Sequence, residues 1–515
     1  MTFHIRGRRP LAAVLAVTAA LAASACGDDA SDQAIDKITV MAPLFGTAPD
    51  ANGELQQAIQ KLIGTKLDIA WVPNADYGDK ANVTLASNNI PDVMVIQGDK
   101  GPSFIQAAKA GAFWDLTGKL DKYPNLKPAD ERTGRNATIN GKTYGIYRVR
   151  PQLRSAVVLR KDWLAKLGLQ PPQTVDDLYT IAKAFTERDP DGNGKKDTYG
   201  LINPKWPTPL FTSDSPYNVI ETWFGTPNGW GERDGKLVPA FDTEEFYTAN
   251  RWLKKWVDEG LVNKDFATLD SANWTDPFIQ GKGGIIIDQN TRGTDLAFKF
   301  KQKDPKDFDK VVMVGNLKRS DGQKFSQPFP GYNGVIAISK QRVRTDKQLD
   351  QVLTTLDKLQ SKEGSVLLSN GIEGRNFQLV DGKAAQINQD DPKVKILQND
   401  VDKAFIQVGT RASVGLGQYP TKYGDDVQQK LFDQRIPLME EDLKTAVFNP
   451  ALPVVSDAYI QRGQTLDPIV SDARIKYLSG AITEEQLRAA VKRWYDSGGT
   501  DVAKETNELV AKLGK

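Results

Sequence analysis

Histidine and cysteine are almost missing from this chain of 515 residues. It has one histidine, His4, and one cysteine, Cys26, and both lie close to the amino terminus. Ser-His-Asp and Cys-His catalysis, zinc held by His or Cys, iron–sulfur clusters and disulfides are therefore excluded from the chain beyond residue 26. Any chemistry there has to use carboxylates, Lys, Tyr, Ser or an oxygen-bound metal.

The chain also lacks an excess of either charge. Its 67 Lys and Arg residues oppose 65 Asp and Glu residues, and without residues 1–25 the formal net charge is −1. We therefore expect no nucleic-acid partner, which would need a clear basic excess. A hydrophobic share of 40% and an aromatic share of 9% are enough to form a large core, and the length suggests two to three domains.

The amino terminus has the pattern of a secretory signal. Arg6, Arg8 and Arg9 precede a short run of small apolar residues at 10–25, and Cys26 follows. The run is short for a membrane span, which needs about 20 residues; a short anchor helix is the alternative. Residues 23–26, ASAC, resemble a bacterial lipoprotein signal, which implies a signal peptide over 1–25 and a lipid on Cys26. Residues 26–36 are then a flexible tether, and the body lies at the outer face of the cell membrane.

Beyond the tether, segments with strand patterns alternate with segments of helical spacing. Strands are predicted at 37–45, 66–73 and 91–98, with helices at 51–63 and 77–87 between them. Further strands are predicted around 142–162, at 283–288 and at 334–339, and the last 120 residues are mostly helical. Such alternation favours parallel sheets covered by helices on both faces. The predicted fold class is α/β with large helical additions.

Residues 189–200, DPDGNGKKDTYG, have the spacing of a calcium loop. Side-chain oxygens at Asp189, Asp191, Asn193 and Asp197 occupy positions 1, 3, 5 and 9, a glycine occupies position 6, and Lys195 offers its backbone carbonyl at position 7. The bidentate glutamate expected at position 12 is replaced by glycine. We predict a structural Ca²⁺ ion here, with an ion-free Asx-rich turn as the alternative.

Several blocks of the chain, in order, are similar to those of the family 1 extracellular solute-binding lipoproteins of ABC importers. They are LASNNIPDVMVIQG (85–98), VLRKDWLAKLGLQPPQTVDDLY (158–179) with the loop after it, QGKGGIIID (280–288), GYNGVIAISK (331–340), NGIEGRNFQLVDG (370–382) and AYIQRGQTLDPIVSDARIKYLSG (458–480). The chain most resembles the long subgroup that includes oligosaccharide- and alginate-oligosaccharide-binding members. That subgroup often carries the calcium loop.

The resemblance implies a two-lobed, periplasmic-binding-protein-like fold of type II, with the ligand in the cleft and a hinge between the lobes. Crossing segments are expected near 148–157 and 328–336. The implied parts are an N-lobe at 37–150 and 331–375, a C-lobe at 151–330 that includes the calcium loop, and a helical part at 376–515 that belongs mainly to the C-lobe.

Ligands of open α/β sheets bind beyond the carboxyl ends of strands, and sugars need planar hydrogen-bonding groups and aromatic faces. The strand ends and the second crossing give the following candidates: Phe45, Gln97, Asp99, Asp288, Asn290, Arg292, Tyr332 and Asn333.

Arginines and tryptophans extend the candidate set. Arg148, Arg150 and Arg154 flank the first crossing and could hold the carboxylates of an acidic sugar, or they could form inter-lobe or surface ion pairs. Trp230 and Trp274 lie in sequence typical of loops and are the preferred aromatic platforms.

The main functional hypothesis is a monomeric binding protein that captures an oligosaccharide, or another polar solute, and delivers it to the permease subunits of an ABC importer. One alternative is a cell-surface glycoside hydrolase or lyase, since a glycosidase needs only two carboxylates. The other is the binding lobe of a sensor or an adhesin.

Overall fold

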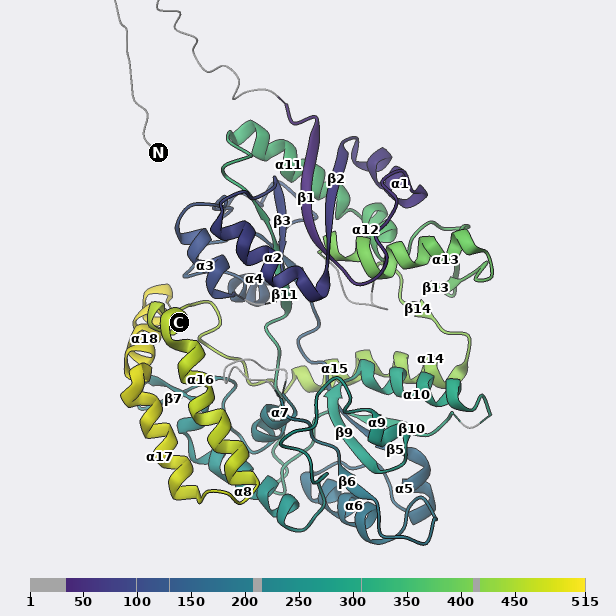
Figure 1. Ribbon diagram of the computed structural model, residues 1–515, viewed down its shortest axis with the longest axis vertical. Coiled ribbons are helices and arrows are strands. Elements are labelled where there is room, and N and C mark those ends of the chain that lie inside the picture. The colour runs from purple at the N-terminus through teal and green to yellow at the C-terminus, as the bar shows by residue number, and fades with distance from the viewer. Residues whose placement is uncertain are drawn as a thin grey trace, which may run out of the picture.

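The computed structural model describes residues 34–98, 100–128, 130–206, 215–306, 308–410 and 417–514. The predicted signal peptide, Cys26 and the candidate Asp99 lie outside these residues. Two lobes, each built around its own sheet, lie one above the other with helices on their outer faces (Figure 1). The predicted two-lobed α/β fold is confirmed.

The first lobe contains a five-stranded sheet in the order β2-β1-β3-β11-β4. Strands β1, β2 and β3 are parallel, whereas β11 is antiparallel to both of its neighbours. Its elements are β1 (Lys37–Leu44), α1 (Glu54–Ile63), β2 (Lys66–Pro73), α2 (Asn74–Ala86), β3 (Val93–Ile96), α3 (Pro102–Lys109), α4 (Glu131–Asn136), β4 (Ile146–Val149), β11 (Tyr332–Ile338), α11 (Asp346–Leu359) and α12 (Lys362–Ser369).

The second lobe contains a four-stranded sheet in the order β10-β5-β9-β6. The predicted capping box is present, because the Thr174 and Asp177 side chains bond each other's backbone N–H at the start of α6. The elements are β5 (Ser155–Arg160), α5 (Lys161–Leu167), α6 (Val175–Glu187), β6 (Tyr199–Leu201), α7 (Pro216–Trp223), β7 (Trp230–Arg233), β8 (Lys236–Pro239), α8 (Glu244–Asp258), α9 (Asp276–Ile279), β9 (Gly283–Gln289), α10 (Thr291–Lys303) and β10 (Val311–Val314).

The last part of the chain divides between the lobes. Leu397, Val401, Phe405 and Val408 pack in the core of the first lobe, so the chain remains with that lobe well past residue 375. Helices α16 to α18 pack on the second lobe. The elements are β12 (Phe377–Val380), β13 (Lys383–Gln386), α13 (Pro392–Asn399), β14 (Thr421–Lys422), α14 (Asp426–Asp433), α15 (Arg435–Leu443), α16 (Asp457–Leu478), α17 (Glu484–Trp494) and α18 (Thr500–Leu513).

Two crossing segments run side by side between the lobes. Residues 150–154 join β4 to β5, and residues 315–331 join β10 to β11. Backbone hydrogen bonds tie the two together: the Arg150 N–H donates to the Gly331 carbonyl at 2.8 Å, and the Phe329 N–H donates to the Gln152 carbonyl at 2.8 Å. These two segments therefore form a paired connection between the lobes, and the chain crosses again between Val408 in the first lobe and Leu431 in the second.

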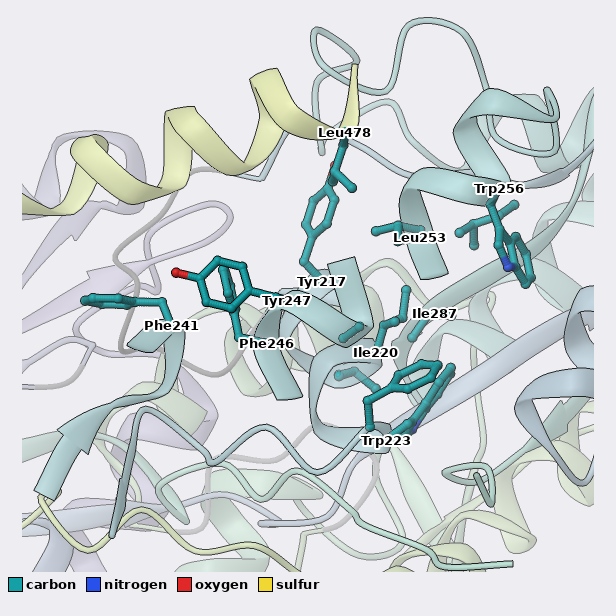
Figure 2. Close-up of a cluster of buried hydrophobic side chains, with 14 of the residues drawn as sticks. Tyr217, Ile220, Trp223, Phe241, Phe246, Tyr247, Leu253, Trp256, Ile287 and Leu478 are labelled. Carbon is teal, nitrogen blue, oxygen red and sulfur yellow. The ribbon is translucent and has the colours of Figure 1, made fainter. Parts of the chain in front are cut away.

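Aromatic residues dominate the core of the second lobe. Trp256 on α8, Trp223 on α7 and Ile287 on β9 belong to one buried cluster, part of which Figure 2 shows. All three side chains are at most 1% exposed. Burial of each contributes about 1.5–3 kcal/mol to the free energy of unfolding, with larger values for tryptophan. Within the described ranges, no helix is both long enough and apolar enough to span a membrane.

The sheet of the second lobe tolerates no added volume at Gly284. A Cβ atom there would collide with the rings of Phe185 and Trp163. We expect Gly284→Ala to lower the free energy of unfolding by about 1–3 kcal/mol, because the core must shift to accept a methyl group. Denaturant unfolding followed by circular dichroism measures this change. The control is Gly78→Ala on α2, where the methyl group meets no atom within 4 Å and should be neutral or stabilising. Equal stability of the two variants would contradict the packing argument.

Candidate functional site

Strand ends from both sheets meet at the junction of the lobes. In the first lobe, Phe45 follows β1 and Gln97 follows β3, and β11 starts at the same edge because it is antiparallel. In the second lobe, β9 ends with Gln289 at the edge where β5 begins with Ser155. The cleft between the lobes is thus lined by strand ends, where ligands of open α/β sheets bind.

A cavity of about 380 Å³ lies in this cleft, and we call it the central cavity. It is lined from the first crossing, from the turn after β9, from the first turns of α10, and from the segment around α14 and α15. The lining residues are Arg150, Pro151, Arg154, Gln289, Asn290, Thr291, Thr294, Asp295, Tyr423 and Arg435. Three cations and one carboxylate give the central cavity an excess of positive charge.

The guanidinium of Arg150 lies in an environment that disfavours its positive charge. Burial, together with the nearby charges of Arg148 and Arg154, lowers the pKa of its guanidinium to about 9. It donates to the Val149 carbonyl at 3.0 Å, and no carboxylate in the described parts of the chain lies within ion-pair distance of it. The group is still charged at neutral pH, so an anionic ligand would supply the missing counter-charge.

Asn290 and Arg435 form a fixed wall of the central cavity. The Arg435 Nε–H donates to Asn290 Oδ1 at 2.8 Å, and the Asn290 N–H donates to the Arg154 carbonyl at 2.6 Å. Asn290 Nδ2 and Thr294 Oγ1 are buried and have no hydrogen-bond partner among the described residues. Buried polar atoms are rarely left unpaired, so these two are available to a bound molecule.

Asp295 is the one carboxylate among the lining residues that the structure describes. Its side chain is open to the cleft, yet the surrounding protein desolvates it and raises its pKa, while Arg292 acts in the opposite direction. Among the described lining residues this carboxylate offsets one of the three positive charges of the central cavity.

The structure brings some of the predicted ligand residues together. Arg150, Arg154 and Asn290 line the central cavity. Gln97 and Asn333 lie at the cleft edge of the first lobe, where Gln97 donates to Asn74 and the Gly98 N–H donates to Asn333 Oδ1. These residues remain candidates.

Other predicted residues point away from the central cavity or are already paired. Arg148 is 2% exposed and donates to Gln407 Oε1 at 2.9 Å and to two backbone carbonyls, so it braces the first lobe. Arg292 and Asp288 form an ion pair with each other at 2.6 Å. Phe45 is exposed at the end of β1 and does not line the central cavity.

The aromatic candidates need correction. Trp274 is 2% exposed and packs in the core of the second lobe against the half-buried ring of Trp206. Trp230 is also buried, at the start of β7. Tyr332 belongs to the core of the first lobe. Each side chain is largely buried because its apolar ring gains more from burial than from exposure. None of the three lines the central cavity, although Trp230 lines a separate small cavity between α3, α16 and α18.

Sequence reasoning missed Thr294, Asp295, Tyr423 and Arg435. Thr294 and Asp295 lie one helical turn beyond the end of β9, so following that strand end a little further would have found them. Tyr423 and Arg435 come from a part of the chain more than 125 residues away, and no local signal marks them.

The loop at 189–197 has part of a metal-binding geometry. The Asn193 Nδ2–H₂ group donates to Asp191 at 2.8 Å and to Asp197 at 3.1 Å, so these three side chains converge. The Asp189 carboxylate instead accepts the backbone N–H groups of Gly192, Asn193 and Gly194.

A cation of the protein itself lies beside this loop. The Lys282 ammonium contacts Asp197 at 2.8 Å and holds the pKa of that carboxyl below its usual range. Thr198, a possible further ligand, is buried and donates to the Phe185 carbonyl. Within the described ranges, no three acidic, His or Cys side chains form a group that could hold a metal ion. The oxygen donors suit a hard cation, but Asp189 and Lys282 would have to move.

Comparison with known proteins identifies the family. Residues 49–371 match the family described as bacterial extracellular solute-binding protein. The chain is 41% identical to lipoprotein LipO of Bacillus subtilis over 92% of both chains. It is 34% identical to the polygalacturonan/rhamnogalacturonan-binding protein YtcQ of the same species, over 92% of this chain and 91% of that one.

A solved structure supports the same fold. The substrate-binding protein FusA of Streptococcus pneumoniae, an EF-hand mutant in complex with fructo-nystose, superposes with a TM-score of 0.63. The superposition covers 93% of this chain and 99% of that one, at 16% identity. With two lobes, a cleft lined by strand ends and a family match over most of its length, this chain belongs to the bacterial extracellular solute-binding proteins.

Proposed function

We propose that this protein captures a carboxylate-bearing oligosaccharide in its central cavity and delivers it to an ABC permease. The observation that carries the proposal is the half-buried Arg150, which faces the cavity with no carboxylate near it in the described residues. Arg154 and Arg435 add two further cations, and Asn290 and Thr294 add unpaired polar atoms. Planar guanidinium groups bind carboxylates with two parallel hydrogen bonds, which suits the uronic acid units of a sugar chain.

The relatives support this substrate class and the mode of attachment. One relative is named for binding polygalacturonan and rhamnogalacturonan, and another is named as a lipoprotein. We propose that Cys26 carries a lipid and that the body works outside the cytoplasmic membrane. The family is described as one of solute-binding proteins, which supports binding as the role of the central cavity.

Replacement of Arg150 tests the proposed function. We expect Arg150→Gln to weaken binding of an acidic oligosaccharide such as trigalacturonate by about 10- to 100-fold, because one charge-assisted bidentate contact is lost. Isothermal titration calorimetry on the mature domain measures the affinity. Arg462→Gln is the matched control, since that arginine forms an exposed ion pair with Asp501 away from the cleft. Unchanged affinity in Arg150→Gln, or binding of neutral and acidic sugars alike, would contradict the proposal.

We also propose that the loop at 189–197 binds Ca²⁺ as a structural ion. Asp189, Asp191, Asn193 and Asp197 would provide side-chain oxygens, and Lys195 would provide its carbonyl. The convergence of Asp191, Asn193 and Asp197 supports this, as does the EF-hand named in the FusA structure. The ion would replace the Lys282 ammonium as the partner of Asp197 and would hold α6 to the start of β6.

Removal of calcium tests this second proposal. A chelator should lower the melting temperature, and Ca²⁺ at 100 times its Kd should restore about 2.7 kcal/mol of stability. Asp191→Ala should abolish the response, whereas Asp346→Asn, an exposed aspartate elsewhere, should retain it. Lys282→Met should strengthen Ca²⁺ binding because it removes the competing cation. A melting temperature that is unaffected by both chelator and Ca²⁺ would show that the loop is an ion-free turn.

A further inference from the structure

A second cavity of about 600 Å³ opens beside the central cavity, and we call it the side cavity. Its walls come from both lobes: β12, β13, β14 and α13 on one side, and α10 and α14 on the other. Figure 1 shows these elements on the same side of the molecule, flanking the gap between the lobes. The side cavity thus lies at the lobe junction, as the central cavity does.

The two cavities are neighbours along helix α10. Tyr423 lines both of them. Helix α10 also runs along both, because Thr291, Thr294 and Asp295 line the central cavity whereas Phe298 lines the side cavity. These positions are three to four residues apart, so they share one face of the helix over a rise of about 10 Å. A chain-like molecule held at Arg150 can therefore continue along α10 into the side cavity.

The side cavity differs in charge from the central one. Its polar lining consists largely of amides, among them Gln386, Gln389 and Gln398. The Gln398 side chain donates to Asp402 at 3.0 Å, and burial raises the pKa of that carboxyl. Lys422, which also lines the cavity, lies 3.8 Å from Asp381. Amide groups can donate to and accept from sugar hydroxyls. Among the described lining residues the cation Lys422 is balanced by the carboxylate Asp402, so the side cavity has no excess of positive charge for a second carboxylate.

Phe298 gives the side cavity an aromatic surface. Its side chain is 48% exposed, although large apolar side chains on amphipathic helices usually face the core. Because the ring lines the cavity, its exposed face is available to the C–H face of a sugar ring. The aromatic platform that the sequence placed at Trp230 and Trp274 is therefore provided by α10.

From these observations we propose that the side cavity is a binding site for neutral sugar units, which makes this protein selective for oligosaccharides of mixed charge. An acidic unit lies at Arg150 and Arg154 in the central cavity, and neutral units extend past Tyr423 onto Phe298. The inference rests on the proposed function, because it extends the ligand from the same arginine site.

Calorimetry with three sugars tests the inference. The probes are digalacturonate, tetragalacturonate, and a tetrasaccharide of alternating galacturonate and rhamnose. We expect the mixed tetrasaccharide to bind about tenfold more tightly than digalacturonate. Tetragalacturonate should gain little, because the described lining of the side cavity has no excess of positive charge for its additional carboxylates.

Replacement of Phe298 tests whether the extra affinity for the mixed tetrasaccharide comes from the side cavity. Phe298→Ala should remove most of the extra affinity for the mixed tetrasaccharide and leave digalacturonate binding unchanged. The control is Ile396→Ala, which removes an exposed apolar side chain from α13 that does not line the side cavity. Circular dichroism melting curves establish that both variants are folded.

The outcomes separate the two proposals. If wild-type protein binds digalacturonate but shows no gain for the mixed tetrasaccharide, or if Phe298→Ala weakens both sugars equally, the side-cavity inference is wrong and the proposed function stands. If wild-type protein binds none of the three probes, the proposed function fails and the inference fails with it.

Discussion

The pairing of the two crossing segments is the interaction on which the site depends. Two backbone hydrogen bonds, from Arg150 to Gly331 and from Phe329 to Gln152, hold the segments together between the lobes. The chain can approach this closely because position 331 is glycine at φ 90°, where a Cβ atom would collide with the Thr133 hydroxyl. The same pairing fixes the backbone of Arg150 and places the Arg154 guanidinium over the Phe329 ring, at 4.1 Å. The cationic wall of the cleft is thus part of the connection between the lobes.

Much of the fold could be predicted from the sequence, because local patterns determine it. The apolar strands at 93–96 and 283–289 and the capping box at Thr174 are visible without any tertiary information. The small sheet of β12, β13 and β14 was not predicted, since its strands have two to four residues and their pairing depends on distant parts of the chain.

The candidate site could be predicted only in part. Strand ends and the first crossing led to Arg150, Arg154 and Asn290, because topology alone brings such positions to the cleft. Trp274 and Trp230 are buried and do not line the central cavity; a glycine- and asparagine-rich neighbourhood does not decide whether a ring turns inward. Tyr423 and Arg435 join the site through tertiary packing. The position of Phe298 in the sequence has the helical spacing of a core residue, so periodicity does not mark it as a residue of the cleft. Local sequence determines which elements form, but the packing of distant elements determines which side chains meet.

The excess of guanidinium groups in the central cavity has a consequence for the medium in which the protein works. A concave surface with three cations and one carboxylate attracts small anions such as chloride or phosphate from solution. A carboxylated sugar has to displace these counter-ions, so its apparent affinity falls as ionic strength rises, whereas contacts made by amides and aromatic rings are screened little. Under the proposed function, the ionic strength around the protein therefore sets the sugar concentration at which the central cavity fills.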